Sequence, residues 1–146
     1  MAKPPLIYVL NGPNLNLLGL REPEIYGSDT LDDIADRLQD RARALKVTLD
    51  IRQSNHEGHL VDWLHDARRT RAKAVILNAG ALTHTSIALY DAVKAIELPV
   101  IEVHLSNPQA RETFRHHSFV APVARGTITG LGALGYELAL DAAVRL

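Results

Sequence analysis

The sequence contains no cysteine, which excludes disulfide bonds, thiolate metal sites and a cysteine nucleophile. It has no segment near the roughly 20 apolar residues that a membrane-spanning helix needs. Residues 1–14 lack the longer apolar stretch of a signal peptide. A formal net charge of -1 gives no electrostatic basis for binding nucleic acid or an anionic membrane. We therefore expect a soluble, cytoplasmic protein with neither kind of partner.

The length and patterning of the chain fit one domain. At 146 residues the chain can bury one substantial core, and no repeat, low-complexity tract or linker divides it. Short apolar runs that predict strands alternate with helical patterns, which is typical of a parallel sheet covered on both faces. These runs are residues 6–10, 47–51, 74–77, 100–105 and 127–129. We predict a single α/β domain over residues 1–146, with a flavodoxin-like, three-layer fold and a five-stranded parallel sheet of order 2-1-3-4-5.

The helices follow from apolar residues at helical spacing. The clearest pattern runs from Leu31 to Leu45, with Thr30 placed as its N-cap and Asp33 as its first-turn acid. Three further patterns predict helices with an apolar side: Leu60, Val61, Leu64 and Ala67; Leu89, Val93 and Ile96; and Leu134, Leu138 and Ala142.

Polar residues follow three of the predicted strands. Asn11 and Asn14 follow the first, Asn78 ends the third, and His104 and Ser106 follow the fourth. In open α/β sheets, ligands bind at the carboxyl ends of the strands near the point where the strand order reverses. We therefore expect these side chains to face one crevice.

Tyr26 and Arg21 share the polar loop after the first strand. An isolated tyrosine on a loop is usually a surface residue, and a phenol that ionises near pH 10 is a poor base. A guanidinium about 4 Å away, at an effective dielectric of about 20, stabilises a phenolate by about 4 kcal/mol before desolvation is subtracted. The pair therefore predicts either a surface tyrosine or a tyrosinate base.

Glu102 and His104 are two residues apart on a predicted strand, so both side chains point to the same face. A carboxylate placed there can orient the imidazole, which suits a general acid. A buried pair whose members satisfy each other's hydrogen bonds is an equally good interpretation of this pattern.

Several other polar residues could have purely structural roles instead of functional ones. Asn78 could be a turn residue, Ser106 a helix cap, and Arg115 or Asp91 a solvated charge. The seven histidines offer no convincing set of three ligands, even where two are adjacent at His116 and His117, so we expect no metal. The GxGxxG spacing of residues 130–135 follows the last strand, where close helix packing explains it better than a dinucleotide does.

Three motifs in order, residues 10–27, 78–86 and 102–118, resemble those of the type II 3-dehydroquinate dehydratases, and the resemblance covers nearly the whole chain. It implies dehydration of 3-dehydroquinate to 3-dehydroshikimate in the shikimate pathway, without cofactor. It assigns Tyr26 as the base, His104 as the proton donor oriented by Glu102, and Arg21 and Asn14 as stabilisers of the base and of the enolate. Substrate-binding roles fall on Asn78, His84, Asp91, Leu105, Ser106 and Arg115, with Asp91 at a subunit contact. The resemblance also implies a homododecamer built from trimers.

Two rival functions use the same fold. A flavodoxin-like module could hold FMN or another phosphate-bearing ligand at the crevice, but phosphate sites usually offer glycines and hydroxyls at a helix start. The first loop offers amides and leucines instead. An acyl hydrolase could use Ser86 or Ser106, yet neither lies in a GxSxG elbow.

Overall fold

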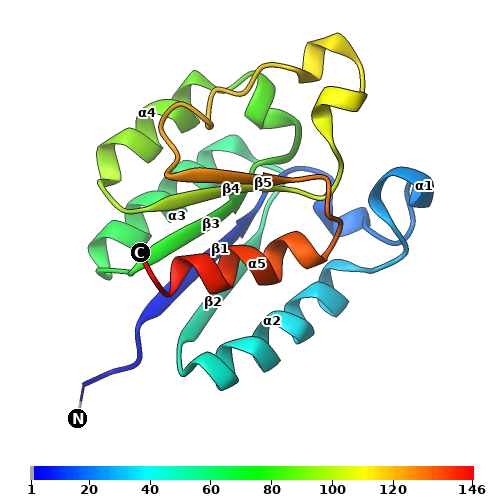
Figure 1. Cartoon of the computed structure of the whole chain (residues 1–146). Coiled ribbons are helices and arrows are strands. Elements are labelled where there is room, and N and C mark those ends of the chain that lie inside the picture. The colour runs from blue at the N-terminus through cyan, green and yellow to red at the C-terminus, as the bar shows by residue number, and fades with distance from the viewer. Residues whose placement is uncertain (1) are drawn as a thin grey trace.

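The computed structural model describes residues 2–146 and has a five-stranded parallel sheet at its centre (Figure 1). The strand order is β2-β1-β3-β4-β5, which confirms the predicted flavodoxin-like topology. The strands are β1 (Leu6–Asn11), β2 (Thr48–Gln53), β3 (Ala74–Asn78), β4 (Val100–His104) and β5 (Gly126–Thr129).

Helices cover both faces of this sheet. Figure 1 shows α2 and α5 together on the near face and α3 and α4 on the far face. The helices are α1 (Pro23–Tyr26), α2 (Leu31–Leu45), α3 (Glu57–Arg69), α4 (Ile87–Ile96) and α5 (Leu134–Ala143), and short 3₁₀ helices occupy Leu15–Leu17, Gly80–His84, Pro108–Ala110 and Thr113–Arg115. No helix within residues 2–146 is long and apolar enough to span a membrane.

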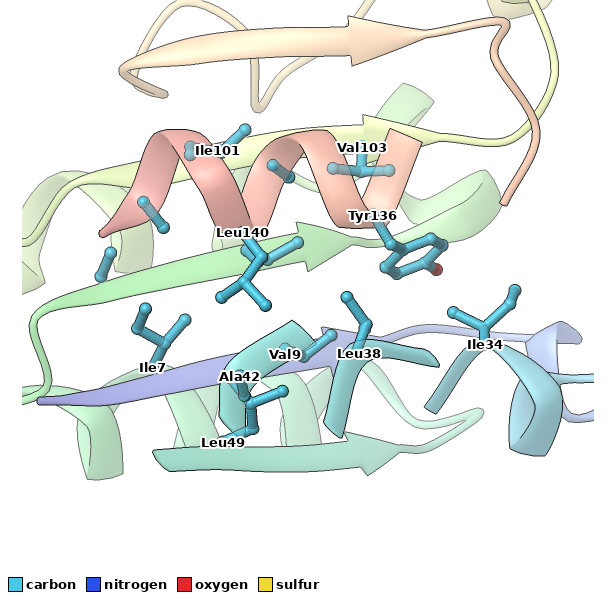
Figure 2. Close-up of a cluster of buried hydrophobic side chains, with 14 of the residues drawn as sticks. Ile7, Val9, Ile34, Leu38, Ala42, Leu49, Ile101, Val103, Tyr136 and Leu140 are labelled. Carbon is cyan, nitrogen blue, oxygen red and sulfur yellow. The ribbon is translucent and has the colours of Figure 1, made fainter. Parts of the chain in front are cut away.

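The start of α2 is fixed by the predicted cap. Thr30 Oγ1 accepts from the Asp33 N–H at 3.1 Å, and the Asp33 carboxylate accepts from the Thr30 N–H at 3.0 Å. These reciprocal bonds satisfy two N–H groups that have no partner inside the helix. With its entry direction set, α2 buries Leu38 and Ala42 against the sheet and α5 (Figure 2).

The apolar side predicted for α5 is not its buried side. Leu134 and Leu138 are 52% and 38% exposed, whereas Tyr136, Ala139 and Leu140 are fully buried. Figure 2 shows Tyr136 and Leu140 pointing from α5 into the core. Both sides of this helix are apolar, so periodicity alone does not select one of them. The buried side combines Tyr136 and Leu140 with the small residues Gly135, Ala139 and Ala143, and the small residues let the helix approach the sheet closely.

The loops after β1 and β3 touch through their backbones. The Gly12 N–H donates to the Asn78 carbonyl at 2.8 Å. A Cβ atom at Gly12 would lie 2.5 Å from the Ala79 carbonyl oxygen, closer than real contacts allow. Glycine is therefore required where these two loops meet at the edge of the site.

Candidate active site

A cleft opens at the carboxyl ends of β1, β3 and β4, where the strand order reverses. Most of the residues singled out by their sequence pattern line it. The lining comprises Pro13, Asn14, Leu15, Arg21, Tyr26, Asn78, Gly80, Ala81, His84, His104, Leu105, Ser106, Pro108, Arg111 and Arg115. Asn11 is fully buried and is not part of this lining, contrary to the sequence expectation.

Arg21 and Tyr26 form a close pair at the mouth of the cleft. Arg21 Nη2 lies 3.4 Å from the Tyr26 hydroxyl, and its guanidinium carbon is 4.6 Å from the centre of the ring. The same nitrogen is 3.3 Å from the carboxylate of Glu22, and the Glu22 side chain is about half exposed. The guanidinium is therefore close enough to stabilise a phenolate at Tyr26.

A second guanidinium, that of Arg111, also contacts this ring. Its central carbon lies 5.1 Å from the centre of the Tyr26 ring, and its Nη1 donates to Ser106 Oγ at 3.1 Å. Its Nε is buried and has no hydrogen-bond partner within residues 2–146. Arg111 has no predicted role, because its position in the sequence, far from the first loop, carries no signal of this contact.

His104 and Glu102 form the predicted pair at the end of β4. His104 Nε2 lies 2.6 Å from Glu102 Oε2, and the two residues are 8% and 2% exposed. A carboxylate only accepts, so Nε2 is the donor when Glu102 is ionised. Nδ1 is left as the nitrogen available to a bound molecule, because His104 lines the cleft and makes no other side-chain hydrogen bond within residues 2–146.

Asn14 is held by residues from the end of β2. Its φ angle of 69° lies in the left-handed region, and its backbone N–H donates to Asn55 Oδ1 at 3.0 Å. Gln53 Nε2 donates to the Gly12 carbonyl at 3.1 Å and to Asn55 Oδ1 at 3.2 Å. Gln53 and Asn55 therefore fix the loop that presents Asn14, a role that sequence analysis missed.

The side chain of Asn78 is committed mainly to the interior. Its Nδ2 donates to the Tyr136 hydroxyl at 2.8 Å, and its Oδ1 accepts from the Gly80 N–H at 3.2 Å. The Tyr136 hydroxyl in turn donates to Asn11 Oδ1 at 2.6 Å. Complete burial raises the pKa of the Tyr136 phenol well above its usual value, so this hydroxyl remains a donor.

Replacing Tyr136 with phenylalanine should lower the free energy of unfolding by about 1 to 3 kcal/mol, the cost of leaving buried amides unpaired. Asn11 and Asn78 would each lose a partner in this variant. Urea denaturation measures the change. The matched control is Tyr90→Phe, since Tyr90 is half-buried on α4. Equal stability of the two variants would contradict the proposed importance of the buried hydroxyl.

His84 lies across the cleft from His104, with ring centres 6.3 Å apart. Its Nδ1 is 2.7 Å from the His117 carbonyl oxygen, which can only accept, so Nδ1 carries a proton. Burial lowers the pKa of His84 below its usual value, although the hydrogen bond to the His117 carbonyl acts in the opposite direction. His84 is therefore neutral at pH 7, and its Nε2 is an acceptor suited to a ligand hydroxyl.

Leu105, Ser106 and Arg115 also lie at the cleft, where the family resemblance places them. Arg115 Nε donates to the Glu112 carboxylate at 2.5 Å, and this bond holds the pKa of Glu112 below its usual value. With three guanidinium groups at its wall, from Arg21, Arg111 and Arg115, the cleft suits an anionic ligand.

Asp91 is exposed on α4 and is not part of the cleft lining, so its role at a neighbouring subunit's site stays a prediction. Within residues 2–146, no group of three or more His, Asp or Glu side chains is arranged to hold a metal ion.

Comparisons with known proteins identify the family of this chain over nearly all of its length. The family model for class II dehydroquinase matches residues 5–144. The 3-dehydroquinate dehydratase of Hyphomonas neptunium is 65% identical over 146 residues, which is 100% of this chain and 96% of the relative. The crystal structure of type II dehydroquinase from Butyrivibrio crossotus has a TM-score of 0.96 at 38% identity, covering 98% of this chain and 99% of that one. The corresponding enzyme from Propionibacterium acnes has a TM-score of 0.91 at 48% identity, covering 99% and 98%. The chain belongs to the class II dehydroquinase family.

Proposed function

We propose that this protein is a hydro-lyase that converts 3-dehydroquinate to 3-dehydroshikimate, and that residues 1–146 act as one catalytic domain. Family membership supports the reaction, since relatives of this chain are 3-dehydroquinate dehydratases. The observation that supports the mechanism is the presence of two pairs at one cleft, Arg21 with Tyr26 and Glu102 with His104. Loss of water through an enolate needs one base and one acid, and each pair can supply one of them.

The first step is removal of the C2 proton beside the ketone. Tyr26, as tyrosinate, takes this proton while Arg21 and Arg111 balance the charge of the phenolate before transfer. The electron pair of the C2–H bond moves onto the ketone oxygen and forms an enolate. Asn14, through an ordered water, stabilises that oxygen.

The second step is loss of the C1 hydroxyl. The enolate collapses, a C1–C2 double bond forms, and the C1–O bond breaks as His104 donates a proton to the departing oxygen. Water leaves, and the product is a conjugated enone. Tyr26 then releases its proton to solvent, and His104 takes up a proton from solvent. Both groups are thereby restored for the next cycle.

The remaining cleft residues hold the substrate for these two steps. The backbone N–H groups of Leu105 and Ser106 cradle the carboxylate, while His84, Arg115 and Asn78 contact hydroxyl groups. Neutral His84 accepts a hydrogen bond through Nε2. Holding the ring in this way makes the elimination effectively intramolecular.

The wider setting follows from the family resemblance. We assign the protein to the shikimate pathway in the cytoplasm, in a homododecamer built from trimers in which Asp91 lends polar support to an adjacent site. Asp91 is exposed on one chain, which is compatible with a contact between subunits.

Purified protein should convert 3-dehydroquinate to a product that absorbs in the ultraviolet as a conjugated enone. Sodium borohydride added with substrate should leave the activity intact, since none of the lysines among the described residues lines the cleft and no imine is expected to form. Borohydride inactivation would overturn the enolate route. A yellow protein with bound flavin and no turnover would instead support the flavodoxin-like alternative.

A further inference from the structure

A hydroxyl group lies behind the acid pair, on a segment far from it in sequence. Ser118 is in the loop between the 3₁₀ helix Thr113–Arg115 and β5. Its Oγ lies 2.9 Å from Glu102 Oε2, the oxygen that also accepts from His104. The other carboxylate oxygen, Oε1, is buried without a hydrogen-bond partner within residues 2–146. Ser118 therefore provides Glu102 with a second hydrogen bond beside the one from the imidazole.

The backbone fixes the direction of this bond. Ser118 Oγ accepts from the N–H groups of Val120 and Ala121 at 3.1 and 2.9 Å. A hydroxyl has two lone pairs and one hydrogen, so its lone pairs are occupied and its hydrogen points at Glu102. A carboxylate cannot donate in return. The hydroxyl therefore cannot turn its hydrogen toward another partner without breaking its hydrogen bonds to the two backbone N–H groups.

The same segment also reaches the other histidine of the cleft. The His117 carbonyl accepts from His84 Nδ1, and the Phe119 N–H donates to the Thr83 carbonyl at 2.8 Å. Residues 117–119 thus contact the loop after β3 and the end of β4 together. A displacement of this backbone would alter the placement of both imidazoles, whereas loss of the Ser118 hydroxyl alone removes only the contact with Glu102 and leaves the His117 carbonyl bond to His84 in place.

From this geometry we infer that Ser118 is a positioning residue for the reaction: it holds the Glu102 carboxylate in the orientation that accepts the Nε2–H of His104, so that His104 Nδ1 faces the leaving hydroxyl. The inference rests on the proposed role of His104 as the acid. Ser118 does not line the cleft beside Tyr26; it lines an adjoining hollow that His84, His104 and Arg115 also border. Its hydroxyl hydrogen is directed at Glu102, so its role is exerted through that carboxylate.

Ser118→Ala should lower kcat by about 10-fold to 100-fold, by analogy with the loss seen when an outer partner that orients a metal-bound histidine is removed. KM should stay close to that of the wild type, because the groups that hold the substrate are unchanged. Ser118→Thr should restore most of the rate, since it keeps the hydroxyl. Ser118 is half-buried and lines a hollow together with Ala121 and Pro122.

Glu102→Gln provides the background that separates this role from a merely structural one. If Ser118 acts through Glu102, adding Ser118→Ala to Glu102→Gln should change kcat little further. An equal loss in both backgrounds would overturn the inference. Thr70→Ala is the matched control for a lost turn hydroxyl, since Thr70 Oγ1 donates to the Asp66 carbonyl at 2.9 Å, away from the cleft. It should leave kcat unchanged.

Proton NMR tests the inference independently of activity. The His104 Nε2 proton, held in a short bond to Glu102, should give a downfield resonance in the wild type that shifts or broadens in Ser118→Ala and persists in Ser118→Thr. An unchanged resonance in Ser118→Ala would overturn the inference. A wild type that shows the resonance without dehydrating 3-dehydroquinate would overturn the proposed function, while the resonance still reports whether Ser118 holds the pair.

Discussion

Tyr26→Phe is expected to lower kcat by about 10² to 10⁴-fold, the usual contribution of a positioned base. The change removes the oxygen that would take the C2 proton and keeps the ring. Arg21 and Arg111 lie 4.6 and 5.1 Å from the ring centre, so both contacts with the aromatic face can persist. We therefore expect KM to change little and the loss to fall on kcat.

The rate of enone formation, followed by ultraviolet absorbance, measures this loss. Exchange of the C2 proton in deuterated water, followed by NMR, should also disappear, because enolate formation needs the same base. Tyr90→Phe removes a tyrosine hydroxyl outside the cleft and should be fully active. Turnover at the wild-type rate in Tyr26→Phe would remove the tyrosinate from the mechanism.

His104→Ala is expected to lose a similar factor, about 10² to 10⁴-fold, at a different step. Without a proton donor, the C1 hydroxyl would have to leave as hydroxide. Tyr26 and Arg21 are untouched, so exchange of the C2 proton should continue while dehydration stops. The two variants therefore divide the reaction: the Tyr26 variant blocks both processes, and the His104 variant blocks only the second.

In His104→Ala the Glu102 carboxylate, which is 2% exposed, would lose its hydrogen bond to the imidazole, and this loss could destabilise the protein. His104→Gln retains a donor that can reach the carboxylate but is no acid, so it should be as inactive as His104→Ala. Urea denaturation checks that each variant is folded. His65→Ala, on the exposed side of α3, controls for loss of a histidine. Simultaneous loss of exchange and dehydration would assign His104 to the first step instead.

The sheet and the two close pairs at the cleft could be predicted because their signals are local. Each strand is a short apolar run, and α2 is marked at its start by Thr30 and Asp33. The strand geometry places Glu102 and His104 on one face with no further information. Arg21 and Tyr26 lie five residues apart in one polar loop, so their 3.4 Å contact is also a short-range event.

The supporting residues could not be predicted because their contacts join distant segments. Asn14 and Asn55 are 41 positions apart, and Ser118 and Glu102 are 16 apart. The buried side of α5 decides where the Tyr136 hydroxyl lies, and that hydroxyl bonds to Asn11 and Asn78 in the interior. Asn11 and Asn78 both end strands, and the sequence alone does not show whether such a residue binds a ligand or bonds to another buried side chain. Only the packing of α5, which brings the Tyr136 hydroxyl to both amides, decides this.

The close approach of Gly12 to the Ala79 carbonyl has a consequence for protein engineering. A graft or an insertion that reshapes the loop bearing Tyr26 would push directly on the chain that leads to His84. Libraries intended to broaden the accepted ligands should therefore exchange residues 12–27 and 79–86 as one matched cassette, taken from a single donor enzyme. Hybrids that combine these two loops from different donors should accumulate poorly, even where each half is tolerated in its own parent.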